Sequence, residues 1–485
     1  MAANYEKGMY NQLMDVMERL SVIEKNLHDE KIEHKDDVDQ LNTKIDSLTQ
    51  ENVVLRNDNA RLKSIIDNDS SNTSLPPSSD EKSGKSSNTF NGRKKTEKKS
   101  GGQHGHKGTT MTKAEVEEKI KAGRCRHEIR RIGNPSSEKF ITKYVVDLAV
   151  ETVITEVRIY ADVNGRINIP PEYRSDVIYG ADTKALTVAL YSEGVMSNDR
   201  IAAFLNAASG NELNLSSGSV YGFCKKLASN SERSIQNLEQ ELLNQKIVST
   251  DATNVTVNGK QSYIRNFSIE STVLYRAMKD KKIKTMKELE FMKKFAGILM
   301  HDHETALYHF GTDHAECNVH ILRYLRKNTE DTSHQWSEQL VSFLCDANKK
   351  RKELIQKNNL FFSPEELYIY EERYKELIEQ GREENKDTRH KYAKKDETTL
   401  LNRLEKYRHN HLLFLYDFKV PFDDNMSERD LRKVKNRQKM AGGFRKDSGQ
   451  EMYCTILSII ETLKRRKMGL IENIKKLFIG TPAIF

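Results

Sequence analysis

The sequence lacks the features of membrane-spanning and secreted proteins. No segment approaches the roughly 18 consecutive apolar residues that a transmembrane helix needs. The N-terminal residues lack the apolar core of a secretory signal peptide. The cysteines are odd in number and widely separated, unlike those of a disulfide framework: Cys125, Cys224, Cys317, Cys345 and Cys454. We therefore expect a cytoplasmic protein in a reducing compartment, with no membrane partner.

Apolar residues are also scarce, at 36% of the 485 residues, whereas 31% of the residues are charged. A chain of this length exceeds one ordinary hydrophobic core, so we expect three or four structural units with much exposed helix or linker. The net charge of +8 is unevenly distributed: residues 82–107 hold eight Lys or Arg against one acid, and 429–439 hold six against one. Such concentrations predict a polyanionic partner such as nucleic acid. A solvated face with a polar linker is the alternative.

The N-terminal residues, 1–70, predict a coiled-coil dimerisation helix. From residue 38 onward apolar residues alternate at steps of three and four, with Leu at d positions and Val, Ile or Asn at a positions: Val38, Leu41, Ile45, Leu48, Asn52, Leu55, Asn59, Leu62 and Ile66. This leucine-zipper pattern favours a parallel homodimer or a higher oligomer, with the buried Asn fixing the register. The alternative is one amphipathic helix that packs on its own domain.

The next three segments differ in composition. Residues 71–112 are rich in Ser, Gly, Lys and Asn and predict a basic flexible linker. Residues 113–178 contain a stretch of alternating apolar residues, which predicts a small β-rich unit. Residues 179–243 predict a helical, helix-turn-helix-like DNA-binding region, with Ser197 and Ser217 as helix caps. A plain packing unit of helices would give the same pattern.

The segment 244–312 predicts the first part of a ribonuclease-H-like core. An apolar strand ends at Asp251, and Asn258-Gly259 then predicts a hairpin. Two further strands follow at 262–269 and 272–278, and then a helix whose Thr285 and Glu288 have capping-box spacing. A buried strand at 295–300 leads to Asp302. Adjacent parallel strands would bring the two acids together at one edge of the sheet.

Residues 313–417 are highly charged and predict a helical insertion in this core. Ser363-Pro364 with Glu366 has the order of a helix start: a cap, proline at the first position and glutamate at the third. We interpret the single tryptophan, Trp336, as a packing anchor rather than a wedge between bases. The core resumes at 418–470, and 471–485 form a C-terminal tail. The whole chain is thus expected to be a multidomain α+β protein.

The segment 421–446 combines an acid with a basic helix. Asp424 or Asn425 would cap the helix, and Gly442-Gly443 would end it. At helical spacing, one stripe carries Glu428, Arg432, Lys435 and Lys439, and Arg445 and Lys446 extend the basic surface. A carboxylate that heads a basic stripe could hold a metal ion beside a phosphate backbone. If Asn425 is the cap, however, Glu428 is in the position of a capping box.

Several motifs occur together in a characteristic order. They are the zipper-like start, NTSLPPSSD at 72–80, GGQHGHKG at 101–108, Asp251-Ala252-Thr253, Asp302 after a buried strand, Cys317-x-x-His320, DDNMSER at 423–429 and Gly442-Gly443-Phe444. Along nearly its whole length the chain resembles the transposases of the bacterial insertion sequence 66 family. This resemblance implies a DDE transposase with the triad Asp251, Asp302 and Glu428. It also implies a helical insertion before the glutamate and two small accessory proteins from the same element.

One departure concerns zinc. Members of the family often carry paired cysteines after the glycine-rich stretch, whereas this chain has only Cys125 with His127 nearby. The unit at 113–178 therefore resembles a degenerate zinc finger. A second set, His314-x-x-Cys317-x-x-His320, could place three ligands on one helix face. We favour a buried structural role there, in which Cys317 and His320 support the core near the second acid.

The resulting hypothesis is metal-dependent cleavage and strand transfer of DNA. Two Mg²⁺ ions, or Mn²⁺ as a substitute, would be held by the triad, with Asp251 bridging them. The DNA partners would be the terminal inverted repeats of the element and the target DNA, in a nucleoid-associated protein. The backbone contacts would come from Arg429, Arg432, Lys433, Lys435, Lys439 and Arg445. The alternatives are a non-catalytic DNA-binding regulator with an inactive core and a related metal-dependent nuclease or integrase.

Overall fold

A computed structural model describes residues 14, 16–26, 38–49, 111–131, 141–388 and 391–480. The chain divides into two compact units, Met1–Lys95 and Thr96–Phe485. In the first unit, 16–26 and 38–49 are helical, and the expected a and d side chains there are exposed: Val38, Leu41, Ile45 and Leu48. Helix formation therefore agrees with the zipper pattern. The heptads after residue 49 and the linker at 71–110 lie outside the described residues, and pairing of two chains stays a prediction.

The prediction of a β-rich unit at 113–178 is wrong for the residues described there, 111–131 and 141–178. They contain a short helix, α2 (Lys113–Lys121), and a 3₁₀ turn, η2 (Pro171–Tyr173), but no strand. The alternating apolar side chains are exposed, with Leu148 and Ile154 at about nine-tenths of their full area. Alternation stabilises a strand only where a neighbouring strand and a core are present to pair with and cover it.

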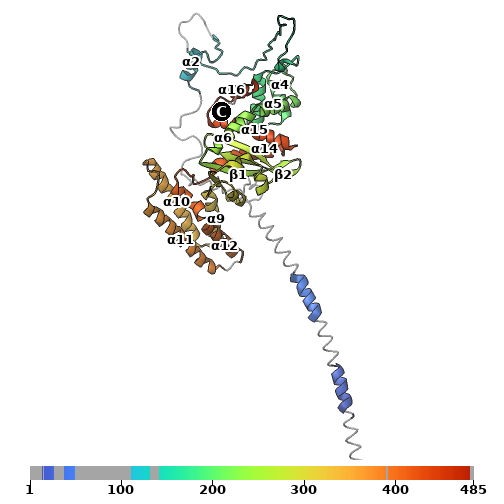
Figure 1. Cartoon of the computed structure of the whole chain (residues 1–485), viewed down its shortest axis with the longest axis vertical. Helices are drawn as coiled ribbons and strands as arrows, with labels where there is room; N and C mark the ends of the chain where they lie inside the picture. Colours follow the sequence, from blue (N-terminus) through green and yellow to red (C-terminus); the bar gives the residue numbers. More distant parts are fainter. Residues whose placement is uncertain are drawn as a thin grey trace, which may run out of the picture. The chain divides into compact units, whose positions relative to one another are not determined.

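The second unit contains a five-stranded mixed sheet with the order β3-β2-β1-β4-β5. The strands are β1 (Ile247–Val257), β2 (Lys260–Ser268), β3 (Val273–Met278), β4 (Ile298–His301) and β5 (Asp313–Glu316). Strand β2 is antiparallel to both β1 and β3, and β4 is parallel to both β1 and β5. Figure 1 shows this sheet with β1 and β2 next to the helices of the C-terminal part.

The hairpin between β1 and β2 confirms the Asn-Gly prediction. Asn258 and Gly259 both have positive φ, at 48° and 73°, which the tight turn requires. The strand itself is longer than expected, because β1 continues through Asp251 to the turn rather than ending there. In this hairpin Asp251 lies opposite Asn266.

Two predictions about the second half of the sheet are wrong. The helix after β3 is replaced by two short ones, α7 (Ile283–Met286) and α8 (Glu290–Lys294), and the Thr285 hydroxyl bonds to Asp280 instead of forming a capping box. The helical insertion also begins later than residue 313. Residues 313–316 form β5, a strand too short to give a periodic signal, and its parallel pairing with β4 completes the sheet.

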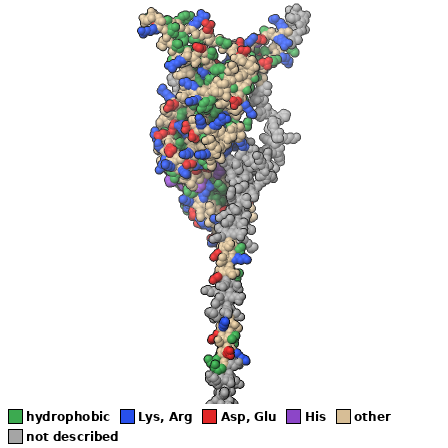
Figure 2. Space-filling model, turned by 90° about the vertical axis from the view of Figure 1, so that its right-hand side faces the viewer, with side chains coloured by type: hydrophobic (Ala, Val, Ile, Leu, Met, Phe, Trp, Pro, Cys, Tyr) green, Lys and Arg blue, Asp and Glu red, His purple; other side chains and the backbone are tan. Residues whose placement is uncertain are grey.

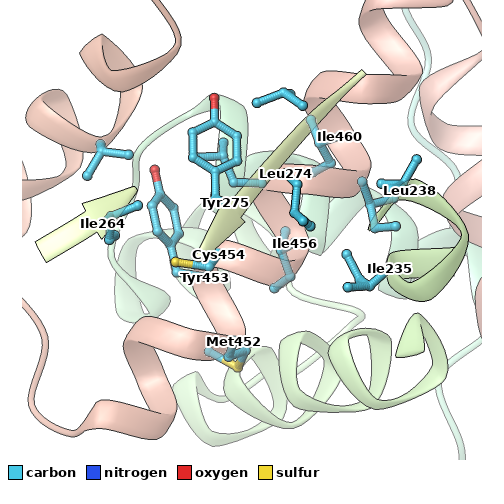
Figure 3. Packing of buried hydrophobic residues seen from close by; sticks show 14 of the residues in the cluster. Ile235, Leu238, Ile264, Leu274, Tyr275, Met452, Tyr453, Cys454, Ile456 and Ile460 are labelled. Atoms are coloured by element: carbon cyan, nitrogen blue, oxygen red, sulfur yellow. The ribbon is translucent and has the colours of Figure 1, made fainter. Parts of the chain in front are cut away.

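The helices around 179–243 share one core with the sheet and the C-terminal helices. They are α3 (Ala181–Glu193), α4 (Asn198–Ala208), α5 (Ser217–Asn230) and α6 (Glu232–Leu243). Helices α3, α5 and α6 pack with α15 (Asp447–Arg465), and α4 packs with α3 and α5. Figure 3 shows Leu274 of β3, Ile456 of α15 and Leu238 of α6 in one group of buried side chains. Ser197 caps α4 as predicted. Helix α5 begins one residue earlier than expected, with Ser216 as its cap.

The predicted C-terminal tail is in part a packed helix. Helix α16 (Leu470–Phe478) lies against α3 and α5, with Ile474 and Leu477 buried. An apolar face at helical spacing explains this packing, because Leu470, Ile474 and Leu477 follow at intervals of four and three residues. The residues after 480 lie outside the described part.

The insertion consists of helices with a second hydrophobic cluster. They are α9 (Asn318–Thr332), α10 (Gln335–Gln356), α11 (Pro364–Lys386), α12 (Lys391–Lys406) and α13 (Arg408–Tyr416). The capping box of Ser363 and Glu366 is formed as predicted. Trp336 is fully buried, and its indole N–H donates to Glu397 over 2.7 Å, which confirms its role as a packing anchor.

The surface of the described residues is strongly charged. On the face seen in Figure 2, Lys and Arg side chains lie among Asp and Glu side chains rather than in one continuous patch. None of the helices in the described ranges is both long enough and apolar enough to span a bilayer. This face therefore shows no continuous basic patch that would mark a DNA-binding groove.

Candidate active site

Asp251 and Asp302 occupy equivalent positions on neighbouring parallel strands. In the register of β1 and β4, Ser249 lies beside Met300. Asp251, inside β1, and Asp302, directly after the end of β4, each follow two residues after that pair, so they lie at the same level along the two strands. Burial raises the pKa of Asp251 to about 7, and the nearby charge of Asp302 adds to the shift. A like charge acts on a pKa in this way only at short range.

Glu428 reaches the same place from α14 (Asn425–Ala441). The helix is preceded by Asp424 as its N-cap, so Glu428 is the fourth helical residue and forms no capping box. The Nε2 atom of His320 lies 3.5 Å from Glu428 Oε1, an oxygen that is buried and has no hydrogen-bond partner. The alternative reading of Glu428 as a helix cap is therefore wrong.

Two basic side chains link the three acids electrostatically. Burial lowers the pKa of His320, and the charges of Asp302 and Glu428 oppose that shift. Burial likewise lowers the pKa of Lys435, and there the opposing charges are those of Asp251 and Glu428. The pKa of each basic group is thus shifted by the charges of two of the three acids. The structure brings together three carboxylates that are spread from residue 251 to residue 428 of the sequence.

Asn266 fixes the position of two of these acids, and the sequence analysis missed it. Its Oδ1 accepts the Asp251 N–H over 2.9 Å, and its Nδ2 donates to the carbonyl of Ser427 over 3.3 Å. One buried amide therefore ties the strand at Asp251 to the residue before Glu428. Counting outward from the Asn258-Gly259 turn would have placed Asn266 opposite Asp251.

The far end of α14 is held by β1. Gly442, in the left-handed region, ends the helix as predicted. Phe444 then exchanges hydrogen bonds with β1: its N–H donates to Thr256 O over 2.7 Å, and its carbonyl accepts the Asn258 N–H over 2.8 Å. A Cβ atom at Gly443 would lie 2.5 Å from Thr256 O, so the close approach requires glycine. Helix α14 is thus attached to the sheet at both ends.

The three-ligand set on one helix face is wrong. His314 lies in β5, Cys317 is the N-cap of α9 and His320 is in the first turn of that helix. His314 instead approaches His301, with 3.2 Å between their ring nitrogens. The Cys317 sulfur accepts the Asp424 N–H over 3.2 Å. Cys317 and His320 therefore contact the start of α14, at Asp424 and Glu428.

The predicted basic residues do not share one surface. Arg429, Arg432, Lys439 and Arg445 are exposed, whereas Lys435 is partly buried beside the acids. Lys433 points toward the protein, where its amino group lies 2.7 Å from Glu193 and also pairs with Glu461. Because these two acids pair its charge, we no longer expect Lys433 to contact DNA.

A second buried acid, Glu316, lies close to the site. It ends β5, and its carboxylate receives the Tyr308 hydroxyl and lies 2.6 Å from both His303 Nδ1 and an Arg403 guanidinium nitrogen. His411 Nε2 is 3.1 Å away. His303 follows Asp302 directly and has a φ of 74°. Glu316 therefore holds the turn after Asp302 against the insertion helices α12 and α13.

The cluster is not a closed metal cage. Across the described ranges, no group of three or more His, Cys, Asp or Glu side chains stands close enough to hold a metal ion. The donor chemistry nevertheless fits a hard divalent cation, since the converging groups are carboxylates. Among them, Glu428 Oε1 and both carboxylate oxygens of Asp424 are buried without a hydrogen-bond partner. A bound cation would have to draw these side chains together.

Comparison with known protein families identifies the family of this chain. The family model described as "Transposase IS66 family" matches residues 176–452, more than half of the sequence. The chain belongs to the IS66 family of transposases. The matched range includes the sheet, the insertion and Glu428, so the resemblance noted in the motifs is confirmed. A search among curated proteins found no match.

Proposed function

We propose that this IS66 family member cleaves and rejoins DNA at the ends of its insertion sequence, with Asp251, Asp302 and Glu428 as a DDE triad. The observation that carries the proposal is the convergence of the three acids from β1, the end of β4 and α14. The strand order, with three antiparallel strands followed by two parallel ones, supports a ribonuclease-H-like core.

The triad is proposed to hold two Mg²⁺ ions, which Mn²⁺ could replace. When bound, such ions supply activation of the attacking hydroxyl and charge stabilisation of the leaving oxygen. The protein's own part is to collect the carboxylates in a partly buried place where they repel one another. Burial raises the pKa of Asp251 first and the nearby charge of Asp302 second, and a bound cation would offset both effects. Asn266 and Phe444 keep α14, and so Glu428, at the sheet.

The exposed residues of α14 are proposed to contact the DNA backbone. Arg432 and Lys439 lie on the stripe headed by Glu428, and Lys435 lies on the same stripe nearer the acids. Arg429 and Arg445 flank the two ends of the helix. Phosphate contacts of this kind position a duplex without reading its sequence.

Glu428→Gln tests the triad. Glutamine keeps the size of the side chain but binds a hard cation poorly, and no capping box is lost. We expect normal folding and at least a ~100-fold loss of Mg²⁺-dependent cleavage of DNA carrying the element's ends, because metal catalysis contributes several kcal/mol. Glu451→Gln, on the exposed face of α15, is the matched control and should cleave normally.

A second candidate is a DNA-binding regulator with an inactive core, which would use the same exposed basic residues of α14, Arg432 and Lys439. The same variant separates the two functions. Full-rate cleavage by Glu428→Gln would remove Glu428 from the mechanism. Binding of the element's ends by the wild type, without cleavage in Mg²⁺ or Mn²⁺, would favour the regulator.

The exposed zipper residues are proposed to join two chains, so that two element ends can be paired. Leu41 and Leu48 are about half exposed in the single chain. Replacing both with Lys in the full-length protein should convert a dimer into a monomer, because charged side chains at d positions disrupt the apolar interface between the two helices. The molar mass from light scattering measures this change. Thr43→Lys, at an outer f position, should leave the dimer intact. An unchanged mass for the double variant would refute this pairing. The two accessory proteins stay a prediction.

A further inference from the structure

Asp424 is an N-cap residue that does not cap. Aspartate before a helix normally accepts a hydrogen bond from an N–H of the first turn. Here α14 has no side-chain cap, and the Asp424 backbone lies outside the extended region usual for caps, at φ −105° and ψ 31°. The carboxylate is also only 2% exposed, so it is not directed to solvent. The common structural reason for aspartate at this position is therefore missing.

The backbone of Asp424 is firmly held, but its carboxylate is not. Its N–H donates to the Cys317 sulfur over 3.2 Å, and its carbonyl accepts the Glu428 N–H over 3.3 Å. The hydroxyls of Ser249 and Ser427 are near the carboxylate, yet neither makes a hydrogen bond of full geometry with it. Both carboxylate oxygens are left buried without a partner.

The charged groups that Asp424 faces are other acids. Burial raises its pKa well above the ordinary value and the charges of Asp251 and Asp302 raise it further, whereas the nearby hydroxyls of Ser427 and Ser249 lower it without cancelling these effects. A carboxylate buried without a hydrogen bond destabilises a fold unless a ligand satisfies it. An unsatisfied acid beside other acids is the arrangement expected when the missing partner is a cation.

We propose that Asp424 is a fourth carboxylate ligand of the divalent-cation site, next to Asp251. This inference rests on the proposed function, because it adds a ligand to the same site. It also accounts for the contact between Cys317 and Asp424: the sulfur fixes the main chain, so that the side chain is aimed at the acids rather than at the helix N-terminus. The competing explanation is a neutral structural aspartic acid.

Metal titration of the full-length protein without DNA tests this assignment. Mn²⁺ binding is followed by the electron paramagnetic resonance signal of the free ion. We expect Asp424→Asn to bind Mn²⁺ at least ~10-fold more weakly than the wild type, a loss of the size seen even for groups that only support a metal ligand. Asp423→Asn is the matched control. Its carboxylate accepts the Asn425 N–H over 3.2 Å, and it should bind Mn²⁺ normally.

A second variant covers the case in which Asp424→Asn folds poorly. Serine is a good N-cap residue, so Asp424→Ser allows the helix to start while removing the carboxylate. It should show the same loss of Mn²⁺ affinity. Wild-type affinity in either variant would overturn the inference and leave a neutral structural aspartic acid.

Asp251→Asn separates this inference from the proposed function. If Asp251→Asn loses Mn²⁺ binding while both Asp424 variants keep it, the triad stands and Asp424 is not a ligand. If Asp251→Asn, Glu428→Gln and the Asp424 variants all bind Mn²⁺ like the wild type, the metal site itself is refuted, and the inference is overturned with it.

Discussion

Glu316 and Asp424 are almost equally hidden from solvent, at 1% and 2% exposed, but their surroundings are opposite. Burial alone would raise the pKa of Glu316. Hydrogen bonds with His303 and His411 and the charge of Arg403 outweigh burial and hold that pKa far below its usual range. Asp424 has acids as its charged neighbours, and its pKa is raised.

This difference distinguishes a buried acid that stabilises the fold from a buried acid that is positioned to bind a ligand. An acid that is fully provided with hydrogen-bond donors stabilises the charged form and fixes the elements that supply those donors. Glu316 does this for β5, α12 and α13. An acid left with unsatisfied oxygens stabilises nothing by itself, so its position is explained by what it can bind. Asp424, with both carboxylate oxygens unpartnered, belongs to this second class, and so does Glu428 through its Oε1.

The largest effect is expected at Glu316. Glu316→Gln should destabilise the protein by roughly 3–5 kcal/mol, because it leaves the Arg403 charge and its histidine neighbours without a buried counter-charge. Urea unfolding of the metal-free protein measures this change. Asp424→Asn serves as the comparison, since removing one of several repelling acids should cost far less. Equal losses of stability in the two variants would break the distinction between the two acids.

The pH dependence of stability should have opposite signs for Asp251 and Glu316. Asp251 has a pKa near 7 in the folded protein against an ordinary 3.8, so between these values the folded state holds a proton that the unfolded state releases. Stability contributed by Asp251 is therefore lost as pH rises from about 4 to about 7. For Glu316 the folded pKa is lowered, and its contribution is lost as pH falls below the ordinary glutamate value of about 4.3.

Urea midpoints measured in chelator between pH 3 and 8 would show both slopes. Asp251→Asn should reduce the decrease of the urea midpoint toward neutral pH. Glu316→Gln should reduce the decrease of the urea midpoint toward acid pH. Saturating Mg²⁺ should flatten the neutral-side slope in the wild type, because a bound cation replaces the proton. A wild-type profile that rises from pH 4 to 7 would contradict the raised pKa of Asp251.

The smallest effect concerns single charges on α14. Lys433 is matched by Glu193 and Glu461, whereas Arg432 is exposed on the stripe of Glu428. Arg432→Ala should weaken binding to duplex DNA and reduce the salt dependence of log K by about 0.9, the share of one phosphate contact. Lys433→Ala should leave that slope unchanged. The reverse outcome would place the DNA on the other face of the helix.

Features set by neighbours in sequence were predictable. The Asn258-Gly259 turn, the strands beside it and the capping box at Ser363 depend on local conformational preference and appear as expected. Predictions that needed a distant partner were less successful. The alternating residues at 141–178 have no strand beside them in the described part, and β5 exists only because β4 lies next to it.

The candidate site divides in the same way. The three acids could be selected from their order, their strand ends and the family motifs. The pairing of Asn266 with Asp251 could have been read from the hairpin. The bond from Asn266 to Ser427 and the burial of Asp424 could not, because the partners lie far away in sequence. Cys317 and Asp424, for example, are 107 residues apart.

By itself, therefore, the sequence determined the local elements, the order in which the acids occur and the basic character of α14, since these depend on side-chain type and short-range periodicity. Only the tertiary structure decided which acids are satisfied and which are not. The contacts made in the folded protein lower the pKa of Glu316 and raise the pKa values of Asp251 and Asp424. They also pair Lys433 with Glu193 and leave Arg432 exposed. The physical reason is that electrostatic energy depends on distances in space and on burial, neither of which is encoded by position along the chain.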